Sequence, residues 1–333
     1  MKKLLALALA LVMILSLSAT AFAADFEPMT WSYTCSASET TDWGKMGSRL
    51  GELVSEATGV EFTVITYPVD QLTGGNQVDG IQAVIDGTID MSGHSNIIYS
   101  NIDQRLNVVS LPFLFSSYED VDAKLDGPAG EAVGRLVEDL GLHLLGIAEN
   151  GFRHITNNVH PIETVEDMAG LKLRVPNSQL INAEYAAWGT NYTNANFSEV
   201  YTGLQNGTFD GQENPLSAAN GSSIQEVVKY CTYWTGIYDC VFFTMNKALY
   251  DSLSPELQAI VDECGAQVAR EQREKVRAED EELQKAWQEA GVEFTYIDGD
   301  SEAAEGFREA AASCYDDFAD IVGQDLLDLF TAD

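Results

Sequence analysis

Two arginines and an asparagine lie within residues 151–215 and could together bind a carboxylate. Arg153 stands in Gly-Phe-Arg-His-Ile-Thr, Arg174 in Gly-Leu-Lys-Leu-Arg-Val-Pro, and Asn214 in Asp-Gly-Gln-Glu-Asn-Pro. A guanidinium keeps its proton in proteins, and its planar N–H groups match the two oxygens of a carboxylate. The chain has 18 basic against 52 acidic residues, so an arginine in a cleft can pair with an acid of the protein or with an acidic ligand. We expect the ligand.

The neighbouring residues allow a second interpretation of each side chain. Pro176 restricts the residue before it to extended backbone, so Arg174 is expected near a strand end, where ligands of open α/β sheets bind. Spacing alone supports a structural ion pair for Arg174 equally well. Arg153 follows Asn150-Gly151, an expected crossover between domains, and could bridge them. Asn214 before a proline is by itself only a turn signal.

The elements that position these residues alternate between strand-like and helix-like segments. Such alternation is typical of α/β domains with largely parallel sheets, and a chain of this length predicts two domains. The expected strands are residues 62–67, 89–92, 142–148 and 171–175, and residues 78–86 form an expected helix closed by Gly87.

The longest expected helix begins at Pro255, after the cap residue Ser254, and ends near Gly291. It would be about 50 Å long at 1.5 Å per residue, which exceeds one small domain. We therefore expect it to run along both domains. The alternative is two shorter helices broken near Gly265. After it, residues 298–302 resemble the start of a calcium loop but lack its glycine, so a helix cap by Asp300 or Ser301 is expected instead.

The first 23 residues have the pattern of a secretory signal peptide. Lys2 and Lys3 precede an apolar run over residues 4–15, and Ala21-Phe22-Ala23 supplies small residues for cleavage after Ala23. The apolar run is too short for a membrane span of about 20 residues. We therefore expect an exported protein that carries no membrane anchor.

The formal net charge is −34, and loss of Lys2 and Lys3 makes it −36. This charge argues against binding to nucleic acid or to anionic lipid, both of which need a basic face. It also repels an anionic ligand, but screening beyond about 8–10 Å allows local arginines to dominate.

The five cysteines predict mostly buried thiols, with room for one or two disulfides. Cys231 and Cys240 are the closest pair in sequence, and the odd count leaves at least one thiol unpaired in a monomer. No Cys-x-x-Cys motif is present, and the four histidines lack metal-ligand spacing. The sequence therefore predicts neither a cofactor nor a metal site.

Motifs of known enzyme classes are absent from the sequence. It lacks a Gly-x-Ser-x-Gly elbow, a His-Glu-x-x-His helix and a phosphate-binding glycine loop. A glycosidase pair of carboxylates could be hidden among the many acids, so a secreted hydrolase stays a remote alternative.

The order of the motifs around Arg153, Arg174 and Asn214, together with Phe197-Ser198-Glu199-Val200-Tyr201, resembles the solute-binding proteins of TRAP transporters, the DctP-like family. Tyr67-Pro68 and Leu111-Pro112-Phe113-Leu114-Phe115 extend the likeness toward the amino terminus. The resemblance implies a two-lobed α/β fold like that of periplasmic binding proteins, with a mainly parallel sheet in each lobe and a long helix spanning both. We expect residues 24–150 with about 240–280 in lobe I and residues 151–239 with about 281–333 in lobe II.

The resemblance also implies roles for particular residues. Arg174 would make the main salt bridge to the ligand's carboxylate, Arg153 a second contact, Asn214 a hydrogen bond and Phe197 an apolar contact. The complete predicted site is Arg174, Arg153, Asn214, Phe197, Asn177 and Ser95. Relatives commonly have Pro and Met just before this aromatic residue, whereas residues 194–196 here are Asn-Ala-Asn, which leaves the substrate open.

The function implied is capture of a small organic acid outside the cytoplasmic membrane, in the periplasm or at the cell surface. A monomer would deliver the acid to the membrane subunits of a TRAP transporter. The alternative is a receptor that presents the ligand to a membrane sensor.

Overall fold

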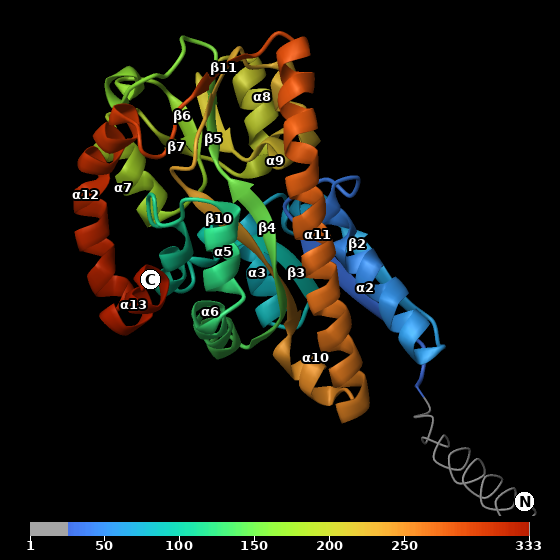
Figure 1. Ribbon diagram of the computed structural model, residues 1–333. Helices are drawn as coiled ribbons and strands as arrows, with labels where there is room; N and C mark the ends of the chain where they lie inside the picture. The colour runs from blue at the N-terminus through green and yellow to red at the C-terminus, as the bar shows by residue number, and fades with distance from the viewer. Residues whose placement is uncertain (1–25, 333) are drawn as a thin grey trace, which may run out of the picture.

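The computed structural model describes residues 26–332, so the predicted signal peptide lies outside the described residues. The described chain forms two lobes, each built on one sheet, with a long helix along their side (Figure 1). This arrangement confirms the two-lobed α/β fold and the helix that spans both lobes. No helix among residues 26–332 combines the length and the apolarity needed to cross a membrane.

The first lobe contains a five-stranded sheet in the order β2-β1-β3-β10-β4. Its strands are β1 (Met29–Cys35), β2 (Phe62–Tyr67), β3 (Met91–Ser95), β4 (Leu142–Phe152) and β10 (Tyr238–Asn246). Strand β10 is buried along its whole length because the sheet is covered on both faces. Phe242 packs with helices on one face and Val241 and Phe243 pack on the other, as the two-residue period of a strand requires.

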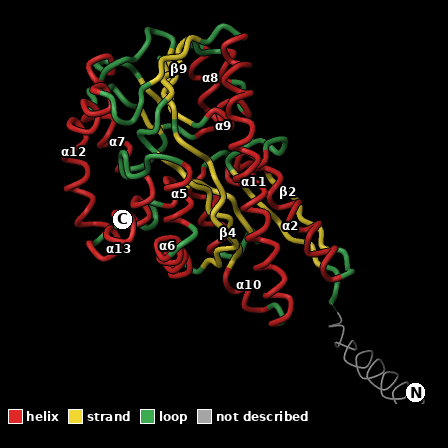
Figure 2. The backbone as a smooth tube through the Cα atoms, in the orientation of Figure 1, coloured by secondary structure: helices red, strands yellow, loops and turns green. Residues whose placement is uncertain are grey.

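The second lobe contains a six-stranded sheet in the order β11-β9-β5-β8-β6-β7. Its strands are β5 (His154–Asn157), β6 (Leu173–Val175), β7 (Thr193–Asn194), β8 (Gly211–Asn214), β9 (Tyr230–Tyr233) and β11 (Glu293–Tyr296). Yellow strands of the two sheets meet near the middle of the molecule in Figure 2.

Both sheets are mixed, whereas the sequence predicted mainly parallel ones. Strand β10 runs antiparallel to β3 and β4, and β5 runs antiparallel to β8 and β9. The chain crosses between the lobes from β4 directly into β5 and from β9 into β10. A strand that enters a sheet from the other lobe arrives without a crossover helix in its own lobe, so it does not follow the parallel pattern.

The helices cover both sheets. They are α2 (Asp42–Thr58), α3 (Gln77–Ile85), α4 (Asn96–Tyr99), α5 (Tyr118–Leu125), α6 (Pro128–Asp139), α7 (Gln179–Ala187), α8 (Val200–Gln205), α9 (Leu216–Gly221), α10 (Lys247–Ser252), α11 (Pro255–Glu289), α12 (Glu302–Val322) and α13 (Gln324–Thr331). Short 3-10 helices are η1 (Pro68–Thr73), η2 (Gln104–Ser110), η3 (Val165–Met168), η4 (Phe197–Glu199) and η5 (Ile224–Glu226).

Helix α11 is continuous, so the alternative of a break near Gly265 is wrong. The Ser254 side chain accepts a hydrogen bond from the Leu257 backbone N–H and begins the helix, as expected. Gly265 is tolerated because its Cα packs against Leu145 of β4, where a β-carbon would lie 2.8 Å from the Leu145 Cβ. Ser301, one of the two predicted cap residues, begins α12.

The carboxyl-terminal helices return to the first lobe. Phe318 of α12 and Phe330 of α13 join the apolar cluster under α5 and α6, and α13 contacts α6. The expected division placed residues 281–333 in lobe II as one block. The sequence contains no signal that α13 packs on α6 of the first lobe, because these two helices are nearly 200 residues apart.

All five cysteines are buried free thiols in the described structure. This agrees with the expectation of mostly buried thiols, and neither of the disulfides that the composition allowed is formed.

Candidate functional site

A cavity lies between the two sheets and is lined by both lobes. It holds only about 20 Å³ of free space, enough for about one water molecule. Five of the six predicted site residues line it. The lining residues are Ser36, Trp43, Gln77, Ser95, Ile98, Asn150, Arg153, Arg174, Pro176, Phe197, Asn214 and Ala218. A wider cleft shares Trp43, Asn150 and Ala218 with this cavity and reaches the surface beside α11.

Arg174 is a buried cation without an acidic partner. It belongs to β6, between β7 and β8, where it lies opposite Thr193 and Gln212. Its Nε and Nη2 atoms donate hydrogen bonds to the Ala195 carbonyl oxygen at 2.9 and 2.6 Å. Within residues 26–332 no carboxylate lies within 4.0 Å of its guanidinium.

The electrostatics of Arg174 favour an anionic ligand. Burial lowers the pKa of Arg174 to about 10, while the negative charge of Glu213 raises it and the positive charge of Arg153 lowers it. At neutral pH the side chain remains charged. A buried unpaired charge carries a penalty of several kcal/mol, which a bidentate carboxylate would relieve. The Phe197 ring lies 5.9 Å from the Arg174 Cζ and forms part of the same wall.

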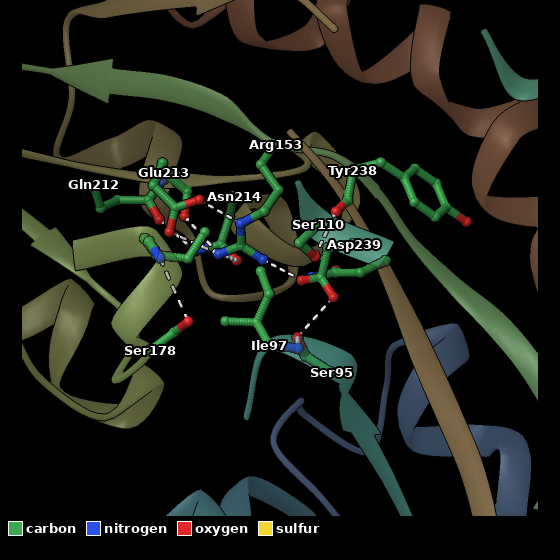
Figure 3. Close-up of polar contacts among 12 residues, drawn as sticks. Ser95, Ile97, Ser110, Arg153, Ser178, Gln212, Glu213, Asn214, Tyr238 and Asp239 are labelled. Atoms are coloured by element: carbon green, nitrogen blue, oxygen red, sulfur yellow. Dashed lines mark hydrogen bonds and ion pairs between the residues drawn. The ribbon is translucent and has the colours of Figure 1, made fainter. Parts of the chain in front are cut away.

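Arg153 is fully engaged with acids of the protein. Its Nη2 donates to Glu213 Oε1 at 2.8 Å and to Asn214 Oδ1 at 3.1 Å. Its Nε and Nη1 also contact Glu213 and Asp239. Figure 3 shows Arg153 between these two carboxylates, with Ser95 beyond Asp239.

The carboxylates keep Arg153 charged despite its burial. Burial acts to lower the pKa of Arg153, but the charges of Glu213 and Asp239 outweigh this effect and raise it. Burial raises the pKa of Asp239, against the lowering effects of Arg153, Ser95 and Asn150. Arg153 therefore makes the contacts of a structural bridge between the lobes, which was the alternative interpretation of its sequence position. One side of it also borders the cavity.

Asn214 is oriented by its neighbours in β8 and β5. Its Oδ1 accepts from Arg153 at 3.1 Å and its Nδ2 donates to Gln212 Oε1 at 2.5 Å. Gln212 in turn donates from Nε2 to Thr156 Oγ1 at 2.9 Å. This chain fixes the amide beside Arg174 and Arg153 before any ligand arrives.

Asn177 lies outside the cavity. It is exposed, and its backbone carbonyl accepts a hydrogen bond from Asn101 Nδ2 at 2.7 Å. The next residue, Ser178, begins α7, so the chain turns away from the cavity at this point. The residue follows Pro176, and its position beside the motif does not bring it to the cavity.

The first lobe lines the cavity with four polar residues, Ser36, Gln77, Ser95 and Asn150. Of these, the sequence predicted only Ser95 as a site residue. Gln77 Nε2 donates to Ser36 Oγ at 2.9 Å, and Asn150 Nδ2 donates to Asp239 Oδ2 at 2.7 Å. The first residue of α3 and the end of β4 bring these side chains to the cavity. The only signal for Asn150 was its place at the predicted crossover.

Groups of three or more acids, histidines or cysteines with the geometry of a metal site are absent from residues 26–332. The site as described consists of one free guanidinium, amides and hydroxyls. It can bind an anion and hydrogen-bond a polar ligand.

The sequence matches the family described as bacterial extracellular solute-binding protein, family 7, DctP, over residues 33–320. It is 31% identical to the 2,3-diketo-L-gulonate-binding periplasmic protein YiaO of Escherichia coli over 297 residues, 89% of this chain and 85% of that one. It is 28% identical to the C4-dicarboxylate-binding periplasmic protein DctP of Rhodobacter capsulatus over 303 residues, 90% of each chain.

The fold is similar to that of solved relatives. The sugar acid binding protein DctPAm of Advenella mimigardefordensis, in complex with galactonate, has a TM-score of 0.86 and 29% identity, covering 92% of this chain and 99% of that one. The family match spans both lobes and the cavity between them. The chain therefore belongs to the DctP family, the solute-binding proteins of TRAP transporters.

Proposed function

We propose that the cavity captures a small organic acid through Arg174 and that the loaded protein delivers it to the membrane subunits of a TRAP transporter. The observation that carries this proposal is the buried guanidinium of Arg174, which borders a cavity and has no acidic partner in the described chain. The ligand's carboxylate supplies the missing charge. Asn214 and Phe197 complete the wall around it.

The relatives support an acid but not one particular acid. Their names include a sugar acid, a diketo sugar acid and C4-dicarboxylates. Their periplasmic location supports the same location for this chain, as does the predicted signal peptide. Delivery to a transporter is favoured over presentation to a sensor because these relatives are TRAP solute-binding proteins.

Catalysis is not part of the proposed function. Glu213 and Asp239, which lie beside the cavity-lining Arg153, are both paired with it. Neither is free to exchange protons with a substrate, so this pair does not support the glycosidase alternative.

Binding is proposed to shift an equilibrium between open and closed lobes. The chain crosses between the lobes at two strand connections, along α11 and along α12, so rotation of the lobes is proposed to occur about these four segments. Closure would bury the carboxylate beside Arg174.

The test begins with mass spectrometry of ligand that co-purifies with the protein, together with a thermal-shift screen of organic acids. An acid is expected to raise the melting temperature, and its methyl ester or amide is not, because neither can pair with Arg174. Equal stabilisation by acid and ester would contradict the proposal.

A further inference from the structure

The charges around the cavity allow for one ligand carboxylate only. Among the described lining residues, Arg153 and Arg174 are the cations. Glu213 and Asp239 both contact Arg153, so the group of three has a net negative charge when both acids are ionised. Among the residues that line the cavity, Arg174 alone has positive charge to offer. The wider cleft adds two lysines and three acids, so it supplies no net positive charge; these residues are Lys45, Lys275, Asp42, Glu149 and Glu279.

The first-lobe wall offers hydrogen-bond acceptors rather than charge. Asn150 Nδ2 donates to Asp239 Oδ2 at 2.7 Å. Because an ionised carboxylate can only accept, the amide nitrogen of Asn150 must face Asp239, and this fixes its Oδ1 on the other side. Within residues 26–332 this oxygen has no hydrogen-bond donor. Gln77 differs, because its amide lies 2.9 Å from the Ser36 hydroxyl, which can donate as well as accept, so Gln77 can present either its oxygen or its nitrogen to the cavity.

An acceptor oxygen attracts a hydroxyl group and repels a carboxylate. A second carboxylate on the ligand would meet Asn150 Oδ1 on one side and the negatively charged group around Arg153 on the other. It would lose its hydration without gaining a counter-charge. A hydroxyl in the same place could donate to Asn150 Oδ1.

We infer that this protein selects hydroxylated acids with a single carboxylate and discriminates against the corresponding diacids. Glu213 and Asp239, which occupy Arg153, are the specificity-determining residues, and Asn150 contributes the acceptor that favours a hydroxyl. The inference rests on the proposed function, since it assumes that Arg174 binds the first carboxylate.

The test uses pairs of acids that differ only at the terminal carbon, a hydroxymethyl group in one and a carboxylate in the other. Suitable pairs are D-erythronate with meso-tartrate, D-ribonate with ribarate, and D-galactonate with galactarate. Calorimetry on the purified full-length mature protein should show that the best monoacid binds at least about tenfold more tightly than its diacid.

Asp239→Asn keeps the shape of the side chain and removes one negative charge beside Arg153. This variant should reduce the preference for the monoacid at least about fivefold, mainly by strengthening binding of the diacid. Glu213→Gln is a second variant with the same expected direction. The matched control is Asp251→Asn, an exposed acid of α10 that pairs with Lys247 and leaves the preference unchanged.

The outcomes separate the two proposals. If acids bind but diacids bind as tightly as monoacids, or if both variants keep the full preference, the inference is overturned and the proposed function stands. If none of the acids binds, the proposed function is overturned and the inference falls with it.

Discussion

Gly221 lies directly against Thr41 across the cleft, and a β-carbon on Gly221 would be 2.6 Å from the Thr41 Cγ2. Gly221 ends α9 in the second lobe, and Thr41 precedes α2 in the first. Thr41 cannot rotate away freely, because its Oγ1 accepts from the Gly44 N–H at 3.0 Å and donates to the Ser38 carbonyl at 2.6 Å. The contact between lobes therefore depends on the missing side chain.

Gly221→Ala should hold the lobes apart and weaken ligand binding at least about fivefold, because the competent closed state becomes less populated. Ala is a better helix former than Gly by about 1 kcal/mol, so the lobe itself should not be destabilised. Calorimetry gives the affinity, and small-angle scattering should show that the loaded variant is more expanded than the loaded wild type.

Two further variants check the cause. Thr41→Ser in the Gly221→Ala background keeps the cap hydroxyl, removes Cγ2 and should restore affinity. Gly306→Ala is the matched helical control, since its β-carbon would lie 3.7 Å from Val165, an ordinary contact. Normal affinity in Gly221→Ala would show that this contact is not needed for binding.

Arg174→Ala should weaken binding of the organic acid at least about tenfold, since a charge-assisted pair contributes about 1.5–3 kcal/mol. The melting temperature of the unliganded variant should not fall, because the mutation removes a buried charge that has no acidic partner in the described chain. Arg135→Ala, which changes an exposed arginine of α6, is the control. Unchanged affinity would remove Arg174 from the site.

Arg153→Ala should destabilise the protein by about 3–5 kcal/mol, because it leaves Glu213 and Asp239 buried without a counter-charge. Urea unfolding of the unliganded protein measures the loss. A triple variant, Arg153→Met with Glu213→Gln and Asp239→Asn, should recover most of it. A loss below about 1 kcal/mol would mean that the group around Arg153 is less important to the fold than its burial indicates.

His154 should make the protein sensitive to acid. Burial lowers the pKa of His154 to about 3, below its ordinary value of about 6.5 in an unfolded chain. Between these values the unfolded chain binds a proton that the folded chain does not, so stability falls as pH falls, by about 1.4 kcal/mol per pH unit at most.

The free energy of unfolding, measured between pH 7 and pH 4, should therefore lose part of its slope in His154→Phe. His160→Gln, at a half-buried position, is the control and should retain the slope. A slope that is the same in wild type and His154→Phe would contradict the assignment.

Local patterns predicted the elements well. The strand at residues 62–67 and the helix that begins at Pro255 were found within two residues, because β-branched runs, caps and a first-turn proline act on neighbouring residues. The position of Arg174 near a strand end could be predicted because the strand, the arginine and the proline are contiguous in sequence. The partners of Arg153 could not, since Glu213 and Asp239 are 60 and 86 residues away and only the folded crossover brings them together.

The exposure of individual residues was the second property that the sequence could not predict. Asn177 and Asn214 are the same residue type beside the same kind of motif, yet one faces solvent and the other is buried in the cavity wall. Composition and spacing do not separate them, because the difference arises from the direction in which α7 leaves β6.

The place of β10 in the first sheet affects the order in which the protein can be made. This strand lies between β3 and β4, yet it is synthesised about 90 residues after β4. Until residues 238–246 have left the ribosome, β3 and β4 have no common neighbour and the apolar side chains on both faces stay uncovered. The first lobe is thus unable to complete its core early in synthesis, and its folding waits for a strand from the last third of the chain.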